Sequence, residues 1–167
     1  MKNLRKPFSI CNFIFFAVFS LVASQPALPQ DFAQDRFLDS FIARIAAKNK
    51  AEEHTDARKI MRADLNQDGQ EDLIVLYTLE NFGGGNLYRQ YLAVFDNTRT
   101  NRPRLLANEV VGGKNRRQVE LTSVEKSRIN LTTLNYLPTD ASCCPSQKGK
   151  VRLTLIKNKF KETRLSK

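Results

Sequence analysis

Between Asp64 and Asp72, oxygen-bearing side chains alternate with spacer residues. Hard cations such as calcium take about six to eight oxygen ligands, which a curled backbone supplies by turning alternate side chains inward. A glycine, Gly69, stands where such a curl must bend sharply, and glycine adopts left-handed backbone conformations at little cost. The sequence therefore predicts one Ca²⁺ site. Its expected ligands are the side chains of Asp64, Asn66, Asp68 and Asp72 and the backbone carbonyl of Gln70.

The loop differs from an EF-hand, in which a bidentate glutamate closes the ligand set at the twelfth position. Val75 occupies that position here, inside an apolar run. The nine residues resemble instead the D-x-[DN]-x-D-G-x-x-D loops of integrin-type FG-GAP and related secreted repeats, in which the last aspartate closes the site. The motif occurs once, which indicates a local site and not a propeller. A metal-free turn is the alternative, because Asn, Asp and Gly also favour turns; mutual repulsion among three carboxylates favours the metal.

Two adjacent cysteines, Cys143 and Cys144, form the second candidate site, in the loop 140–146. An oxidising compartment favours a disulfide between them, although so small a ring demands a distorted or cis peptide. A free dithiol, pairing with another molecule and metal binding are the alternatives. Zinc normally needs four ligands, and His54 lies far off in the chain. A catalytic redox pair would more often have C-x-x-C spacing at a helix start.

Residues 1–24 have the pattern of a secretory signal peptide, with an apolar run at 10–23 and cleavage expected near Gln25. The basic start is formed by Lys2, Arg5 and Lys6. The apolar run is short for a membrane span of about 20 residues. Cys11 stands too early to be a lipidation site. We therefore expect a periplasmic or secreted protein without a transmembrane or lipid anchor. Removal of the signal peptide with its three basic residues would lower the formal charge from +10 to +7.

The rest of the chain, residues 25–167, reads as a single α+β domain. The spacing of Asp31 and Gln34 predicts a helix capping box, and apolar residues recur behind it with helical periodicity: Phe37, Leu38, Phe41, Ile42 and Ile45. The charged segment 51–59 is expected to be a linker or a frayed turn. Eight strands are predicted after it: 60–64, 72–79, 88–95, 104–110, 118–124, 129–136, 150–156 and 160–164.

Several of these strands alternate apolar and polar residues, which is typical of strands with one buried and one wet face. Short turns between them predict a curled antiparallel meander or a partial barrel, and the amphipathic helix would pack on one open face of it. The chain has no Gly-x-Ser-x-Gly motif, and no helix start follows Gly83–Gly85 to make a phosphate cradle.

The order of the acidic loop, the strand 91–95, the turn 111–114 and the Cys-Cys-Pro-Ser loop at 143–146 is similar to small exported bacterial proteins of unassigned function. The last third also resembles the mycobacterial LppP/LprE lipoprotein family, from which this chain departs by lacking a lipobox. The resemblance implies the fold and an exported location; it brings no activity.

Two classes of function follow from the sequence. The favoured one is an exported, calcium-stabilised binding module that recognises an envelope or extracellular protein or a glycan, with no nucleic-acid partner. The alternative is a small periplasmic hydrolase or thiol-redox accessory factor that uses Asp140 or the Cys143–Cys144 pair.

Overall fold

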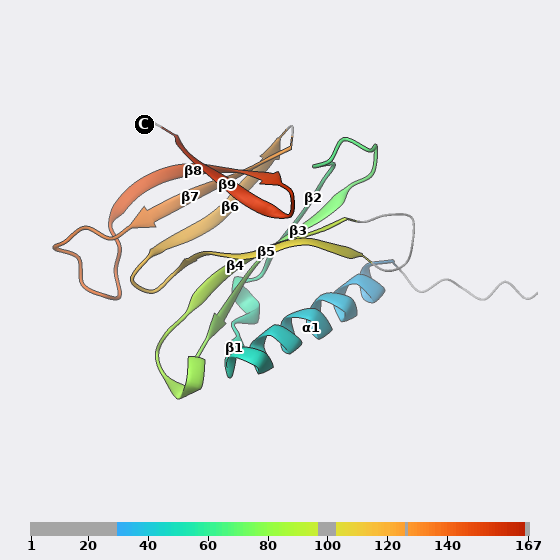
Figure 1. The fold of residues 1–167 in the computed structure, drawn as a ribbon. Coiled ribbons are helices and arrows are strands. Elements are labelled where there is room, and N and C mark those ends of the chain that lie inside the picture. Colours follow the sequence, from blue (N-terminus) through green and yellow to red (C-terminus); the bar gives the residue numbers. More distant parts are fainter. Residues whose placement is uncertain (1–29, 97–102, 126, 166–167) are drawn as a thin grey trace, which may run out of the picture.

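The computed structural model describes residues 30–96, 103–125 and 127–165. They form one long helix and an antiparallel sheet, so the α+β class expected from the sequence is confirmed (Figure 1). The predicted signal peptide, residues 1–24, lies outside the described residues. In the part of the chain that is described, no helix combines the length and the apolar character needed to cross a membrane.

Helix α1 spans Gln30–Asn49 and confirms the predicted amphipathic helix. Its apolar side buries Leu38, Phe41, Ile42 and Ala46 against the sheet. The helix ends in a Schellman motif, because Lys50 has a left-handed φ of 50° and two backbone bonds close the last turn, from Lys50 N to Ala47 O (3.1 Å) and from Ala51 N to Ala46 O (3.0 Å).

The sheet has nine strands, and each neighbouring pair is antiparallel. From β3 to β9 every strand lies next to the strand that follows it in sequence, while β1 and β2 both pair with β3. The strands are β1 (Glu52–Glu53), β2 (Lys59–Ala63), β3 (Asp72–Glu80), β4 (Arg89–Asp96), β5 (Arg104–Gly113), β6 (Arg117–Glu125), β7 (Arg128–Asn135), β8 (Gln147–Ile156) and β9 (Lys159–Leu165). Two short 3₁₀ helices, η1 (Thr55–Ala57) and η2 (Phe82–Gly84), lie in connections.

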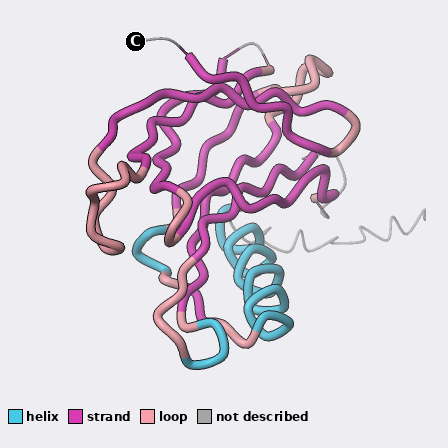
Figure 2. The backbone as a smooth tube through the Cα atoms, turned by 60° about the vertical axis from the view of Figure 1, so that its left-hand side comes forward, coloured by secondary structure: helices cyan, strands magenta, loops and turns pink. Residues whose placement is uncertain are grey.

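The sheet divides between β5 and β6, which pair only at Gly113 and Arg117. We call β1–β5 the first half-sheet and β6–β9 the second half-sheet. The two halves enclose a core that includes Leu76, Leu92, Leu121 and Leu131. Figures 1 and 2 show the resulting layers, with α1 on one side of the first half-sheet and the second half-sheet on its other side.

Strands β3 and β4 occupy the middle layer, whereas β7 and β8 alternate buried and more exposed residues, as expected for strands with one wet face. Every residue of β3 up to Leu79 is buried, and so are the last six residues of β4. One face of β3 contributes Ile74 and Leu76 to the core between the half-sheets, and the other contributes Val75 and Tyr77 to the contact with α1.

All eight predicted strands are present, with ends that shift by a few residues. The expectation of a linker or frayed turn at 51–59 misses the strand β1, while the single 3₁₀ turn η1 also lies in this segment. In the described strands the sheet is open, with no backbone pairing that closes it into a barrel.

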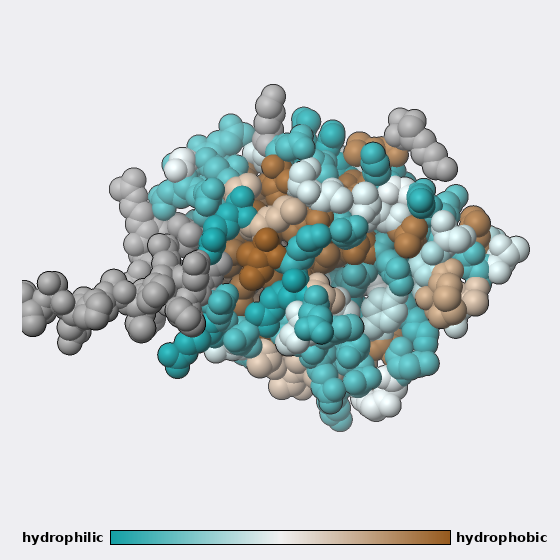
Figure 3. All heavy atoms as spheres, turned by 180° about the vertical axis from the view of Figure 1, so that it is seen from behind, coloured by the Kyte–Doolittle hydropathy of each residue, from teal (hydrophilic) through white to brown (hydrophobic). Residues whose placement is uncertain are grey.

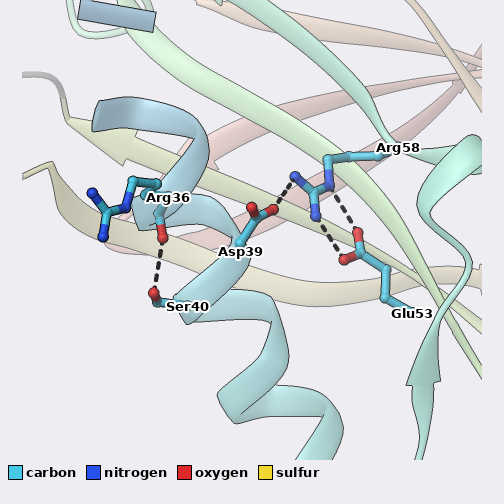
Figure 4. Close-up of polar contacts among 5 residues, drawn as sticks. All are labelled: Arg36, Asp39, Ser40, Glu53 and Arg58. Carbon is cyan, nitrogen blue, oxygen red and sulfur yellow. Dashed lines mark hydrogen bonds and ion pairs between the residues drawn. The ribbon is translucent and has the colours of Figure 1, made fainter. Parts of the chain in front are cut away.

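Helix α1 is fastened to the sheet by Arg58, whose guanidinium contacts two carboxylates (Figure 4). Arg58 Nε and NH2 bond the two carboxylate oxygens of Glu53 at 2.8 and 2.7 Å, and NH1 bonds Asp39 Oδ1 in α1 at 2.8 Å. The hydrogen bonds to Glu53 raise the pKa of Arg58, an effect that burial partly opposes. Nearby in the same view, Ser40 Oγ donates to Arg36 O at 2.8 Å. The charged residues of this segment thus hold the helix in place.

Side chains satisfy the backbone where the two half-sheets separate. The Gln90 side chain bonds the Val119 backbone twice, donating from Nε2 to the carbonyl (3.0 Å) and accepting from the N–H (2.8 Å). Arg117 Nε donates to Val111 O at 2.8 Å. These contacts replace the strand pairing that β5 and β6 lack. On the face seen in Figure 3, hydrophilic residues cover most of the surface and hydrophobic ones show between them.

Candidate functional site

The predicted calcium loop connects β2 to β3. Ala63 pairs with Asp72 as the last step of that ladder, so the residues between them form a hairpin loop, which is largely exposed apart from the buried Leu65. Gly69 has a φ of +85°, the left-handed conformation expected for it, and a Cβ at this position would meet no atom within 4 Å. Gln67 is also left-handed, with a φ of 63°. The backbone is therefore curled along this loop, as the sequence predicts.

Three of the predicted ligands surround the backbone N–H groups of this curl. Asp64 accepts hydrogen bonds from Asp68 N (3.2 Å) and Gly69 N (2.9 Å) with its two carboxylate oxygens. Asn66 Oδ1 also accepts from Asp68 N at 2.9 Å, and Asp68 Oδ1 accepts from Gln70 N at 2.8 Å. Asp64, Asn66 and Asp68 are thus brought together at the inside of the loop.

The fourth side-chain ligand, Asp72, is placed differently. It begins β3, is only 1% exposed, and accepts a hydrogen bond from Leu65 N with Oδ2 at 3.0 Å. Burial raises the pKa of the Asp72 carboxyl, which the backbone hydrogen bonds from Leu65 and Asn66 partly oppose. This carboxylate ties the start of the loop to its end, a structural role that its sequence position did not reveal.

The loop offers carboxylate, amide and carbonyl oxygens, which is the donor set that calcium prefers. Each carboxylate oxygen has two lone pairs, so one N–H bond leaves a further acceptor position on Asp64 and Asp68. Within residues 30–96, 103–125 and 127–165, however, no group of three or more His, Cys, Asp or Glu side chains is arranged to hold a metal ion. The chemistry of the donors fits calcium.

The cysteine loop connects β7 to β8 and lies at the surface. Cys143 and Cys144 are both exposed and are joined by a disulfide bond between neighbours. Their Cα atoms are 3.8 Å apart, the distance across a trans peptide, and none of the described peptide bonds is cis. Of the distorted or cis peptide expected for this ring, the cis form is therefore not present.

Asp140 organises the cysteine loop from within. Its Oδ2 accepts hydrogen bonds from Leu137 N (2.8 Å) and Ser146 N (2.9 Å), and its Oδ1 accepts from Ser146 Oγ (2.8 Å). These bonds lower the pKa of the Asp140 carboxyl, with the bond from Leu137 contributing most. Tyr136 adds a bond from its hydroxyl to Ser142 O at 2.9 Å. Asp140 therefore acts as the brace of this loop.

A groove that the sequence did not indicate lies on the second half-sheet. It has a volume of about 440 Å³ and crosses β6, β7 and β8. Its lining includes Gln118, Thr132, Leu134, Lys148 and Lys150. The two lysines alternate along a strand, which could have indicated a basic surface, but the groove itself depends on how three strands lie together.

His54, the single histidine, lies away from both loops. Its Nδ1 is 3.4 Å from Glu80 Oε2, and both side chains are at least 40% exposed.

Compared with protein-family models, with curated proteins and with solved structures, the chain gives no match. The resemblance of its last third to a lipoprotein family stays an expectation, and the function has to be inferred from the two loops and the groove.

Proposed function

We propose that the chain is an exported binding module of the bacterial envelope, stabilised by one Ca²⁺ in the loop 64–72. The observation that carries this proposal is the convergence of Asp64, Asn66 and Asp68 on the backbone N–H groups of residues 68–70. Oxygens held around a curl in this way are positioned for a cation. Binding would require the Asp72 carboxylate and the Gln70 carbonyl to join them, which couples the metal to the first residue of a buried strand.

The scaffold of the module is a curled meander that we interpret as a partial barrel. Side-chain contacts support this interpretation at both seams between the half-sheets. Lys59 Nζ of β2 lies 3.2 Å from Glu120 Oε1 of β6. On the other side Phe160 N of β9 donates to Glu109 Oε1 of β5 at 3.2 Å. Such a scaffold presents its connecting loops, including the cysteine loop, as recognition surfaces for a protein or a glycan.

Calcium binding is tested by thermal unfolding of the wild type and of Asp68→Ala, with calcium and with chelator. A ligand that binds only the folded state at about 100 times its Kd stabilises by about 2.7 kcal/mol. The wild type should therefore melt at a higher temperature with calcium, and Asp68→Ala should lose that gain. Equal melting temperatures with calcium and chelator for the wild type would make the loop a plain turn. Export is tested by N-terminal sequencing of the protein from the host, which should begin near Gln25.

The enzyme alternative has one observation in its favour, the exposure of both cysteine side chains. A thiol-redox accessory factor needs its disulfide within reach of a partner thiolate. Asp140 suits a hydrolase poorly, because three hydrogen bonds engage its carboxylate and hold its pKa low. Reduction of the Cys143–Cys144 bond by a dithiol protein, with turnover, would favour the redox function over the binding module.

A further inference from the structure

The outer face of the second half-sheet is strongly basic. Along β7 and β8 the residues Ile129, Leu131, Val151 and Leu153 point into the core between the half-sheets. Because side chains alternate along a strand, their neighbours point outward. The strand register continues this outer face onto β9. It carries six cations, which we call the basic face: Arg128, Lys148, Lys150, Arg152, Lys159 and Lys161.

The charges of the basic face are largely uncompensated. The same face of β6 holds two carboxylates, Glu120 and Glu125, and Glu120 already lies 3.2 Å from Lys59. Among the residues the structure describes, no carboxylate pairs with the four lysines of the basic face. These side chains are exposed and are available to an anionic partner.

The groove lies within this face and holds two of its lysines. Lys148 and Lys150 stand about 6.5–7 Å apart along β8, as alternate residues of a strand do. Across the groove, Leu134 pairs with Lys148 in register and Thr132 pairs with Lys150. Gln118 lies beside Leu134 on the next strand. The groove thus combines two cations, an amide, a hydroxyl and one apolar side chain with the carboxylate of Glu120, which lies 3.2 Å from Lys59.

The composition of this face separates the classes of anionic partner. None of the outward residues on β6–β9 is aromatic, so the face lacks the stacking platforms with which proteins hold unpaired bases. It also lacks the Trp and Phe side chains that anchor proteins in a lipid interface. Amide and hydroxyl groups beside cations suit a sugar, which presents hydroxyls together with charged groups.

We propose that the basic face binds a linear anionic polysaccharide, with one sugar unit in the groove and its anionic groups on Lys148 and Lys150. Arg152 and the lysines of β9 would extend the contact along the chain. The proposal rests on the function of the protein as an exported binding module and specifies its partner. It uses neither the calcium loop nor the cysteine loop.

The test is binding of a labelled dextran sulfate fragment to the purified protein, followed by fluorescence anisotropy, with uncharged dextran of equal length as the control probe. The wild type should bind dextran sulfate and not dextran, and the affinity should fall as salt is raised. Lys148→Gln/Lys150→Gln should weaken binding on the order of tenfold at low salt. The matched variant Arg36→Gln/Lys48→Gln removes the same charge from exposed positions on α1 and should change the affinity by less than about twofold.

Equal losses in the two double variants would overturn the proposal, because net charge alone would then drive binding. A second result would also overturn it: single-stranded DNA or phosphatidylglycerol vesicles bind more tightly, per unit charge, than dextran sulfate, and the Lys148→Gln/Lys150→Gln change abolishes that binding. The melting temperatures of the variants, taken in the same buffer, show that both are folded. If calcium stabilises the protein but no polysaccharide binds, the proposed binding module stands and the polysaccharide partner is wrong. If the polysaccharide binds but calcium does not stabilise the protein, the calcium site is wrong and the partner stands.

Discussion

Arg117 and Glu162 form a two-bond ion pair that joins β6 to β9, the two outermost strands of the second half-sheet. NH1 lies 2.8 Å from Oε1 and NH2 lies 2.6 Å from Oε2. The Arg117 side chain is 8% exposed and that of Glu162 is 30% exposed. Because β7 and β8 lie between these strands in the sheet, the pair spans the concave inner side and holds its curl.

Arg117→Met should lower the free energy of unfolding by about 1–3 kcal/mol, measured by urea titration. Breaking one partner of a buried pair costs about 3–5 kcal/mol, and the partial exposure of Glu162 reduces this. The matched control is Lys59→Met, whose pair with Glu120 is exposed on both sides and should be worth less than about 1 kcal/mol. Equal effects of the two changes would mean that the Arg117 pair does not hold the fold.

The same pair makes stability depend on pH. The Arg117 guanidinium lowers the pKa of the Glu162 carboxyl below its ordinary value, so the folded state favours the ionised form. The stabilisation is present above the pKa that Glu162 has in the unfolded chain and is lost as the pH falls through the lower folded pKa. Urea titrations from about pH 7 to pH 3 should show a smaller loss of stability for Glu162→Gln than for the wild type. A parallel decline in both proteins would contradict this linkage.

Gly69→Ala should destabilise the protein by about 1 kcal/mol through the backbone alone. The position has a φ of +85°, and the added methyl would meet no neighbour within 4 Å. Gly85→Ala is the control, because Gly85 has an extended backbone with a φ of −94° and its Cβ would touch only Phe82 O at 3.4 Å. Differential scanning calorimetry should show a clear loss of Tm for the first change and little for the second. Comparable losses would show that the curl at Gly69 is not required.

Changing Cys143 and Cys144 together to Ser should leave the melting temperature nearly unchanged. A bond between neighbours closes almost no chain, so it removes little entropy from the unfolded state. Asp140 and Ser146 keep the loop braced without it. Intact mass spectrometry after alkylation of the native, unreduced protein should find no free thiol in the wild type. Two alkylated cysteines would mean that the disulfide does not form.

Most strands could be predicted, because apolar runs are clearly separated by turn residues. Strand β1 could not be predicted. Glu52 and Glu53 lack the apolar residues that mark a strand in the sequence. Their place at the edge of β3 depends on the bonds that Arg58, later in the sequence, makes to Glu53. The two-sided burial of β3 and β4 had a signal in the continuous apolar runs 73–77 and 91–95, which are typical of strands covered on both faces.

The candidate sites were predictable to different degrees. The curl of the calcium loop follows from Asp64, Asn66, Asp68 and Gly69 themselves, because short polar side chains bond the nearby backbone. The burial of Asp72 follows from the position of β3 between two layers, and the apolar run 73–77 that signals this position stops short of Asp72 itself. The basic face likewise needs the register of three strands, since only pairing places β8 and β9 cations side by side.

The consecutive order of β3 to β9 has a consequence for how the chain acquires its structure. Each strand needs only the next one along the chain as its partner, so every pairing step closes a short loop and costs little chain entropy. The Gln90 and Arg117 side chains, which connect β6 to β4 and to β5 respectively, would then join two halves already formed.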